Sequence, residues 1–392
     1  MINVVDLFSG AGGLTFGFQK KIVRNRFVDD DRFNVIFANE YEKNAAYTFK
    51  MNFPGVPMIQ EDIGELDLVY LQQMYLDISN VDIVIGGPPC QSYSTVGKRQ
   101  YDNRARMYRE YRRMLSILQP KLFIFENVLG LLTMKNDLGL PVIDDVVKSF
   151  NDFSEFNGAI GYTVQKKVLN AQDFGVPQSR ERVFLVGVRK DLNLERDWCF
   201  PTAGAMQKHV SVGDAIGDLP ELVNGAGTNH YTKHPYTKYQ FLMRGNQKVL
   251  KNHVNGVNGR KILKIMEVVP EGEGRPYINQ LVQKGKLAQE FYLTSGYGNS
   301  YGRLWWNRPS TTITNNLSTP SSLRCIHPKQ NRALTSREGA RLQSFPDNFI
   351  FYGSKEQVNS QIGNAVPSLL SMHLANSVID FFESNKFIRQ EG

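Results

Sequence analysis

Short apolar runs alternate with stretches of helical periodicity over the first 190 residues of the chain. The runs have the length and composition of buried strands, which are expected at 2–8, 34–39, 58–60, 82–85, 121–125, 162–169 and 182–188. Helices are expected between them, at 13–20, 42–49, 107–118 and 142–150. This alternation predicts an α/β fold with a doubly wound, mostly parallel sheet and helices on both faces.

The alternation ends after residue 189. Residues 200–310 are rich in Gly, Asn, Thr and Lys and hold few periodic runs, which predicts a second, smaller, loop-rich domain. A further helix is expected at 260–268, regular structure is expected to return at 336–342, and a last helix is expected near 367–382. Residues 20–32 are expected to form a surface loop. We therefore expect a main domain of residues 1–195 plus 345–392 and a smaller domain of residues 196–344.

The positive charge of the chain is concentrated in the smaller domain. Residues 228–286 hold eleven Lys and Arg against three Glu, an excess equal to the net charge of +8 of the whole chain. Such a region favours a polyanionic partner, most simply nucleic acid. A solvated basic face is the alternative interpretation.

Apolar runs, the N-terminal residues and the cysteines indicate in which cellular compartment the protein is expected. No apolar run approaches the roughly 20 residues that span a bilayer, and the N-terminus lacks the basic region of a signal peptide. The three cysteines, Cys90, Cys199 and Cys325, are far apart, which argues against a disulfide framework and gives no metal-ligand spacing. We expect a cytoplasmic protein with no metal and no membrane partner.

One of the cysteines follows a buried strand directly. The segment Gly86–Ser92 (GGPPCQS) succeeds the apolar run 81–85, and its glycines and prolines end the strand. Ligands bind at the carboxyl ends of the strands in an open parallel sheet. The thiol of Cys90 is therefore a candidate nucleophile, and a small buried cysteine is the alternative.

Three further strand ends carry residue types that bind ligands. The turn Asp6–Gly13 (DLFSGAGG) lets a ligand approach the backbone at a helix N-terminus, although Thr15 replaces the third glycine of the dinucleotide fingerprint. Glu40 and Asp62 end the next two strands, where Glu40 can bind ribose hydroxyls and Asp62 an adenine amino group. Together they describe a pocket for a nucleoside-bearing cofactor, while each alone is as readily a tight turn or a cap.

A carboxyl group and two guanidinium groups are expected at the same edge. Glu126–Val128 (ENV) ends the fifth strand, one strand–helix unit beyond Cys90. Gln178–Arg182 (QSRER) opens the last strand and brings Arg180 and Arg182 near that edge, where they can donate to a carbonyl or a phosphate. For Glu126 the alternative is a structural cap.

With these motifs in this order, the chain resembles the cytosine-C5 DNA methyltransferases. Asp6–Gly13 is similar to the family's first motif, which holds S-adenosyl-L-methionine, and Pro89–Gln91 to its nucleophile motif. Glu126–Val128 and Gln178–Arg182 are similar to its acid and arginine motifs. Residues 332–347 resemble its ninth motif and residues 361–367 its tenth. Only residues 200–310 lack a match, and there the family keeps its variable target-recognition domain.

The resemblance implies a Rossmann-like methyltransferase sheet and a set of site residues. The implied catalytic residues are Cys90, Glu126 and Arg182, with Arg180 in support. The implied contacts to the cofactor come from both ends of the chain: Phe8, Ser9, Gly10, Gly12, Gly13, Leu14, Glu40, Asp62, Ile63, Pro88, Asn364 and Ala365.

The resemblance also implies the reaction. Addition of the Cys90 thiolate to C6 of a cytosine makes C5 nucleophilic, while Glu126 contacts N3 and the exocyclic amine and Arg182 holds O2. The methyl group of S-adenosyl-L-methionine then passes to C5, and S-adenosyl-L-homocysteine is left. Because a stacked base is out of reach, the cytosine must be flipped out of double-stranded DNA.

Contacts to DNA are expected from two regions. Residues 92–106 are expected to form a mobile loop that closes on DNA, and residues 229–234 and 244–248 are the best candidates for reading bases. The Gly-rich segment Tyr297–Arg303 either approaches DNA or forms a structural turn. The expected contact residues are Gln91, Ser92, Lys98, Arg99, Arg104, Lys233, Arg244 and Lys248.

Three alternatives stay open on the sequence alone. The first is a tRNA cytosine-C5 methyltransferase, although segment 199–202 (CFPT) interrupts the Cys-Phe-Thr of that subgroup. The second, a catalytically silent DNA-binding relative, is disfavoured by the intact set of Cys90, Glu126 and Arg182. The third, a Rossmann oxidoreductase, is disfavoured by the missing third glycine. We expect a monomer that acts beside a cognate restriction endonuclease.

Overall fold

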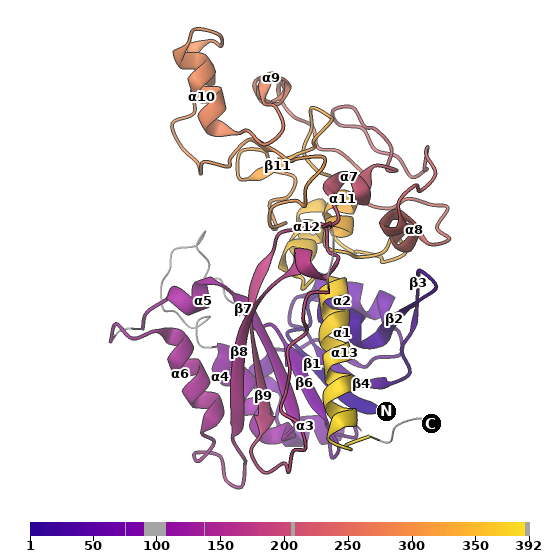
Figure 1. Ribbon diagram of the computed structural model, residues 1–392, viewed down its shortest axis with the longest axis vertical. Coiled ribbons are helices and arrows are strands. Elements are labelled where there is room, and N and C mark those ends of the chain that lie inside the picture. Colours follow the sequence, from indigo (N-terminus) through magenta and orange to yellow (C-terminus); the bar gives the residue numbers. More distant parts are fainter. Residues whose placement is uncertain (75, 90–106, 137, 205–207, 389–392) are drawn as a thin grey trace.

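The structure, a computed structural model, describes residues 1–74, 76–89, 107–136, 138–204 and 208–388. Its lower part is built around one sheet, and its upper part consists of short helices and long connections (Figure 1). No helix in the described ranges is both long and apolar enough to cross a membrane.

The sheet of the lower part has seven strands in the order β5-β4-β1-β6-β7-β9-β8. Their bounds are β1 Ile2–Leu7, β4 Phe33–Asn39, β5 Met58–Ile59, β6 Ile83–Gly86, β7 Leu122–Val128, β8 Tyr162–Asn170 and β9 Glu181–Arg189. The strands from β5 to β7 pair in parallel, whereas β9 is antiparallel to both β7 and β8. Only ten residues separate β8 from β9, too few for a parallel crossover with its own helix. The expected mostly parallel, doubly wound sheet is confirmed.

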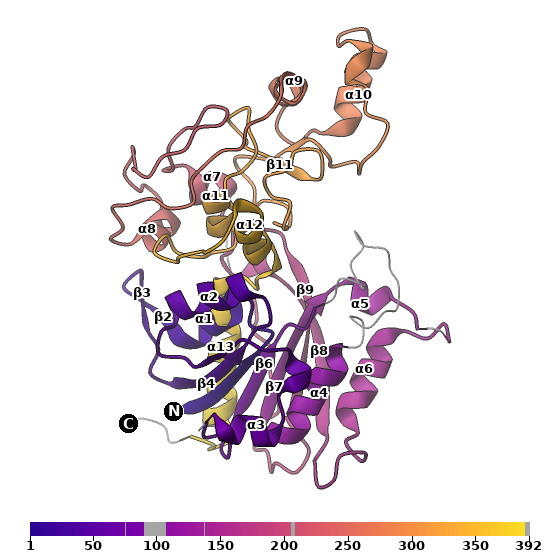
Figure 2. The same ribbon diagram turned by 180° about the vertical axis from the view of Figure 1, so that it is seen from behind.

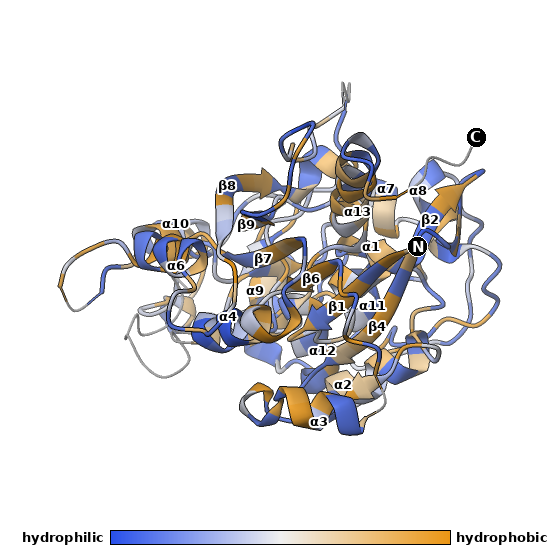
Figure 3. Cartoon of the chain, turned by 90° about the horizontal axis from the view of Figure 1, so that it is seen from below, coloured by the Kyte–Doolittle hydropathy of each residue, from blue (hydrophilic) through white to orange (hydrophobic). Residues whose placement is uncertain are grey.

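Two apolar layers cover the faces of this sheet. Ile2 and Val4 of β1 face the layer of α1 (Gly13–Gln19), α2 (Lys43–Asn52) and α13 (Ser368–Ser384). Val5 and Leu7 face the layer of α3 (Leu68–Gln73), α4 (Met107–Leu118) and α6 (Val142–Asn151). Alternate side chains of a strand point to opposite faces, and α13 and α4 accordingly lie on opposite sides of the sheet (Figures 1 and 2). Seen from below, hydrophobic residues gather along the central strands (Figure 3).

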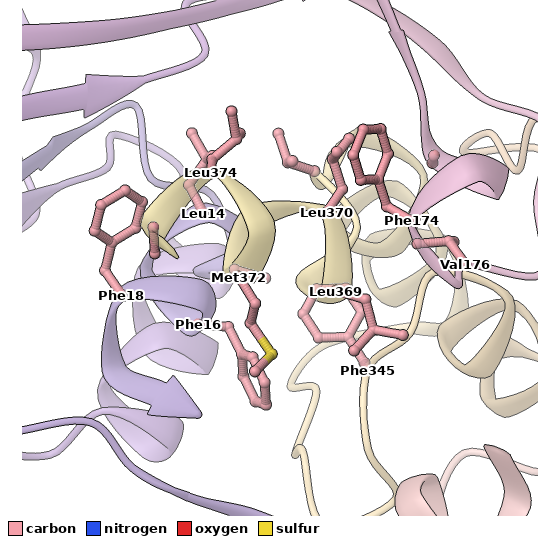
Figure 4. Close-up of a cluster of buried hydrophobic side chains, with 14 of the residues drawn as sticks. Leu14, Phe16, Phe18, Phe174, Val176, Phe345, Leu369, Leu370, Met372 and Leu374 are labelled. Atoms are coloured by element: carbon pink, nitrogen blue, oxygen red, sulfur yellow. The ribbon is translucent and has the colours of Figure 1, made fainter. Parts of the chain in front are cut away.

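The last helix closes the first of these layers. Leu370 and Leu374 of α13 are buried in the same cluster as Leu14 and Phe18 of α1 (Figure 4). The two helices approach closely because Gly17 has no side chain, and the hydroxyl of Ser371 donates to the carbonyl of Leu14 over 2.6 Å. The C-terminal helix is therefore an integral part of the sheet domain.

We expect Gly17→Ala to lower the free energy of unfolding by about 1–3 kcal/mol, the usual cost of overpacking. A Cβ at this position would overlap the backbone of Ser371 and Met372, which cannot move without shifting α13. Gly55→Ala is the matched control, because a Cβ there meets no atom within 4 Å. Urea unfolding of both variants tests this, and an unchanged stability of Gly17→Ala would contradict the close packing of α1 on α13.

The prediction of a surface loop at 20–32 is wrong, because residues 20–29 form a β-hairpin. β2 (Lys20–Val23) pairs antiparallel with β3 (Arg26–Asp29). The turn between them, Arg24–Asn25, has φ values of 49° and 59°, as a two-residue hairpin turn requires. The ring of Phe27 packs edge-on against Phe16 at a centroid distance of 5.1 Å and anchors the hairpin on α1.

The upper part holds more helices than the sequence patterns indicate. The helix expected at 260–268 is confirmed as α9 (Arg260–Val268), and the regular structure expected at 336–342 is the helix α11 (Ser336–Leu342). The others are α7 Val212–Ile216, α8 Lys238–Arg244, α10 Arg275–Gln283 and α12 Lys355–Asn364, with short strands β10 Gly302–Arg303 and β11 Arg324–Ile326. Capping boxes begin α7, α8 and α12, so the ends of these short helices are specified locally.

Buried arginines hold the upper part together. Arg341 donates to the carboxylate of Asp347 over 2.7 and 2.9 Å and also to that of Asp218. Arg337 donates to the backbone carbonyls of Pro346 and Phe349, both over 3.1 Å. Buried guanidinium groups need such partners to offset the cost of desolvation. The chain on the two sides of the predicted boundary at residue 344 is therefore joined by hydrogen bonds.

Candidate functional site

The carboxyl ends of β1, β4, β6 and β7 meet at the upper edge of the sheet, below α12 and the upper part (Figure 2). Four turns leave the sheet there and carry most of the described site residues. Two groups of these residues are distinct, one around the turn after β1 and one around the end of β7.

The turn after β1 is held open by unusual backbone conformations. Phe8, Gly10 and Gly12 have φ values of 57°, 56° and 94°, in the left-handed region that glycine adopts at low cost. The amide of Ser9 donates to the carbonyl of Asn39 over 2.9 Å and ties the turn to β4. A Cβ on Gly10 would meet no atom within 4 Å, so open space lies beside this part of the backbone.

Glu40 lies against the glycine turn. Its two carboxylate oxygens accept the amides of Gly10, over 2.8 Å, and Glu42, over 2.7 Å. Burial raises the pKa of this carboxyl, and the two amides oppose that shift. Each oxygen keeps a lone pair for a further donor, such as a ribose hydroxyl.

Asn39 is a site residue that the sequence analysis missed. Its buried side-chain amide donates to the carbonyls of Ile59 and Glu61, over 3.1 and 2.9 Å, and joins the ends of β4 and β5. The signal in the sequence is an amide residue directly before an acid at a strand end. Asn39 thereby fixes the position of the chain that leads to Asp62.

Asp62 and Ile63 begin the turn after β5. The Asp62 carboxylate caps the short helix η1 (Ile63–Glu65) by accepting the amide of Gly64 over 2.9 Å. The carbonyl of Ile63 accepts Nη2 of Arg113 over 2.6 Å. The cap that was the alternative for Asp62 is therefore present, and its exposed carboxylate keeps lone pairs for a ligand.

The C-terminal site residues lie beside the same turn. A Cβ on Gly13 would overlap the carbonyl of Val366 and lie 3.2 Å from the Cβ of Ala365. Asn364, the last residue of α12, is exposed. Residues more than 350 positions apart in the sequence are thus neighbours, as the first and tenth motifs led us to expect.

Asp6 lies buried beneath the glycine turn. Its Oδ2 accepts the hydroxyl of Thr15 over 2.5 Å, and its Oδ1 has no hydrogen-bond partner among the described residues. Burial raises the pKa of Asp6 to about 7. The folded protein therefore keeps this proton at pH values where the unfolded chain releases it.

We expect the contribution of Asp6 to the stability of the protein to fall as the pH rises from about 4 to about 7. In this window Asp6 holds its proton in the folded chain and releases it in the unfolded chain, so this one group makes unfolding easier as the pH rises. Between pH 5 and pH 7.5 the wild type should lose about 2–3 kcal/mol relative to Asp6→Asn, which cannot ionise. Urea unfolding of both proteins at the two pH values tests this, and identical pH profiles would contradict it.

The second group surrounds the end of β7. Glu126 is buried and Arg182 is half-buried, and Nε of Arg182 lies 3.1 Å from Oε1 of Glu126. Burial raises the pKa of Glu126, while the charges of Arg182 and Arg180 oppose that shift. Oε1 has no aligned hydrogen-bond donor within the described ranges. The pKa of Glu126 therefore lies above the ordinary value of a glutamate carboxyl.

Close packing explains why the two positions 86 and 87, shortly before Cys90, are glycines. A Cβ on Gly86 would lie 2.5 Å from the carbonyl of Leu7, and a Cβ on Gly87 would lie 3.0 Å from Oε2 of Glu126. Pro88 is buried, and its carbonyl accepts Nδ2 of Asn127 over 3.4 Å. Asn127, which the sequence analysis gave no role, thus connects the acid motif to the segment that enters the nucleophile motif.

Arg180 joins three parts of the chain. Its guanidinium donates to the carbonyls of Ile313 and Gly363, both over 3.0 Å. The neighbouring Gln178 accepts the amide of Ile313 over 2.8 Å and donates to the carbonyl of Leu342 over 3.0 Å. These contacts fix β9, and with it Arg182, against the chain that returns from the upper part.

Several predicted site residues lie outside the described residues: Cys90, Gln91, Ser92, Lys98, Arg99 and Arg104. The expected mobile loop at 92–106 lies outside them as well. Their roles stay predictions.

The three remaining basic residues lie around α8. The guanidinium of Arg244 stands 3.6 Å above the ring of Tyr231 and donates to the carbonyl of Lys233 over 2.6 Å. Lys233 also lies 3.3 Å from the carboxylate of Glu221, and Lys248 is exposed. Contacts of these residues to DNA stay predictions.

No group of three or more His, Cys, Asp or Glu side chains suited to a metal ion occurs in the part of the chain that the structure describes.

Comparison with known proteins points to one family. A family model described as C-5 cytosine-specific DNA methylase matches residues 2–380. The Type II methyltransferase M.DdeI of Desulfomicrobium norvegicum is 33% identical over 400 residues, covering 99% of this chain and 91% of the relative. The Type II methyltransferase M1.HphI of Haemophilus parahaemolyticus is 34% identical, covering 96% and 87%.

Solved structures agree in fold. An E. coli prophage protein assigned to the DNA modification methyltransferases is 26% identical with a TM-score of 0.71, covering 97% of this chain and 99% of that one. DNMT2 of Spodoptera frugiperda, at 16% identity, 97% and 100% coverage and a TM-score of 0.59, is similar in fold alone. Because the family model spans nearly the whole chain, this protein belongs to the C-5 cytosine-specific DNA methylase family and is a DNA (cytosine-5-)-methyltransferase.

Proposed function

We propose that the enzyme transfers the methyl group of S-adenosyl-L-methionine to C5 of a cytosine that is flipped out of double-stranded DNA. The observation that carries this proposal is the pair of the buried Glu126 and the half-buried Arg182 at the same sheet edge as the turn Phe8–Gly13. One half of the edge suits a nucleoside cofactor, and the other suits a neutral heterocycle with a ring nitrogen and a carbonyl oxygen.

The turn after β1 fits S-adenosyl-L-methionine. The open space at Gly10 admits a ligand to the backbone, and the carboxylate of Glu40 is positioned to accept ribose hydroxyls. Asp62 and Ile63 are proposed for the adenine end, and Pro88, Asn364 and Ala365 for the remaining contacts, together with the other residues of the turn and Leu14. When bound, the cofactor supplies an electrophilic methyl group.

The chain's own groups activate the cytosine. The thiolate of Cys90 adds to C6, and electron density moves towards C5 and N3. A protonated Glu126 donates a hydrogen bond to N3 and offsets the charge that develops there, and its raised pKa supports this role. Arg182 donates to O2. After methylation, loss of the C5 proton and elimination of Cys90 restore the aromatic ring.

The remaining assignments complete the proposal. Residues 1–195 plus 345–392 form the catalytic domain and residues 196–344 the target-recognition domain. Gln91, Ser92, Lys98, Arg99 and Arg104 contact DNA near the flipped base, and Lys233, Arg244 and Lys248 contact it from the second domain. We place the enzyme in the cytoplasm as a monomer, with a cognate restriction endonuclease acting on the same sequence.

Methyl transfer with labelled S-adenosyl-L-methionine tests the proposal. We expect label in 5-methylcytosine at one sequence of duplex DNA and none in tRNA. S-adenosyl-L-homocysteine should raise the melting temperature, because a ligand that binds only the folded protein stabilises it, and NAD should not. Label in tRNA alone, or no response to S-adenosyl-L-homocysteine, would overturn the proposal.

A further inference from the structure

Two regions of the upper part lie on opposite sides of the molecule. The region of α8 lies above the β2–β3 hairpin, and Nδ2 of Asn25 donates to the carbonyl of Lys238 over 3.1 Å. α10 lies on the other side, above α5 (Gly130–Thr133), in both views (Figures 1 and 2). Because β7 ends with Glu126–Val128 and leads into α5, the side of α10 is the side of the catalytic acid.

Residues 260–301, which we call the arm, have a small core of their own. Ile265, Val269 and Ile278 are buried together, apart from the two large clusters. Phe291 and Tyr301 are among the partly buried residues that pack against them. A segment with its own core keeps its shape while it projects from the rest of the domain.

One loop of the arm is fixed at both ends. The side chain of Asn279 in α10 donates to the carbonyl of Leu293 over 2.9 Å and accepts its amide over 2.8 Å. At the other end, the amide of Arg275 donates to the carbonyl of Ser300 over 2.9 Å. A loop held in this way has little conformational freedom to lose when it binds a ligand.

The residues between these anchors are turned to solvent. Residues 294–298 are exposed and Asn299 is half-buried. Thr294, Ser295, Tyr297 and Asn299 carry hydroxyl or amide groups, which can donate to and accept from base edges in a DNA groove. Tyr297 as a whole is 50% exposed.

The arm also carries free positive charge. Lys284 and Lys286 follow α10, are exposed, and have no ion-pair partner in the ranges that the structure describes. Exposed ammonium groups of this kind hold phosphates and orient a protein on DNA. On the opposite side, Lys248 is exposed as well, whereas the guanidinium of Arg244 is engaged with Tyr231 and the carbonyl of Lys233.

We propose that the loop 294–299 reads the base sequence of the target, while Lys284 and Lys286 hold the neighbouring phosphates. The inference rests on the proposed function, which supplies the DNA duplex as the partner. It assigns sequence recognition to the side of the molecule on which Glu126 lies.

Tyr297→Ala and Asn299→Ala test the loop, once methylation mapping of the wild type has given its target. The measurement is the ratio of kcat/KM for the target duplex to that for duplexes with one base pair changed. We expect at least one of these variants to lose about 5- to 150-fold of this discrimination at one position, the effect of a single base contact. Tyr236→Ala, which removes a similarly exposed tyrosine on the side of α8, should keep the wild-type ratio.

Two further measurements separate recognition from folding and from catalysis. The loop variants should keep the melting-temperature rise with S-adenosyl-L-homocysteine, because the cofactor site is intact. Lys284→Gln combined with Lys286→Gln should weaken binding to all duplexes alike and reduce the slope of log affinity against log salt by about 2.

Unchanged discrimination in both loop variants would overturn the inference, as would a similar loss in Tyr236→Ala. Either result leaves the proposed function intact, provided that the wild type methylates cytosine in one duplex sequence. If the wild type methylates no duplex, the proposed function itself fails.

Discussion

Cys90→Ser is expected to bring methyl transfer below detection while DNA binding and cofactor binding persist. A serine hydroxyl is not ionised near neutral pH, whereas a thiol with an ordinary pKa near 8.5 supplies some thiolate and is the better nucleophile. Without addition to C6, C5 of cytosine stays unreactive towards a methyl donor. Turnover on duplex DNA and binding of the same duplex, measured side by side, test this.

Cys199→Ser is the matched control, because Cys199 is an exposed cysteine outside the motifs. DNA with 5-fluorocytosine at the target should trap the wild type and Cys199→Ser in an adduct that survives denaturation, since fluorine cannot leave as a cation. Cys90→Ser should form no adduct. Near-normal turnover of Cys90→Ser would rule out the covalent route.

Glu126→Gln is expected to lower kcat by about 10²- to 10⁴-fold, the usual contribution of a positioned acid or base. Glutamine keeps the shape of the side chain but cannot carry the proton that burial favours on Glu126. In the wild type, kcat should fall as the pH rises through the raised pKa of Glu126, because the neutral carboxyl is the donor to N3. The variant should lack this dependence on pH.

Glu155→Gln makes the same change in a surface glutamate paired with Arg112, and it should keep wild-type kcat. Both variants should keep the stabilisation by S-adenosyl-L-homocysteine. If Glu126→Gln retains kcat within about threefold, the carboxyl does not act on the base, and Arg182 alone would have to stabilise the charge.

Most strands of the sheet were predictable because they are short apolar runs bounded by glycine, proline or polar residues, whereas β8 contains Gln165, Lys166 and Lys167. The β2–β3 hairpin was not predictable, since charged residues surround the few apolar positions that define its faces. Its turn at Arg24–Asn25 has no glycine, and its anchor is the ring of Phe16 in a neighbouring helix. Similarly, α8 is a helix of only 7 residues, fixed by a capping box and by its contacts, and is too short to give a periodic signal.

Among the site residues, too, some positions could be predicted from the sequence and others could not. Glu40 and Glu126 were predictable because both end parallel strands, whose carboxyl ends share one edge. The role of Arg180 was not, because its partners are the carbonyls of Ile313 and Gly363, more than 130 positions away. Every residue has a backbone carbonyl, so a contact to one does not depend on the residue type of the partner. Such a contact therefore cannot be recognised in a sequence.

The packing of α13 on α1 constrains how the protein is made. The ribosome translates α1 within the first twenty residues and α13 only after residue 367. Until then Leu14 and Phe18 lack the partners in α13 that help to cover them in the finished fold. A nascent chain therefore exposes an apolar strip through almost the whole of synthesis, and chaperones or slow translation would act on this strip.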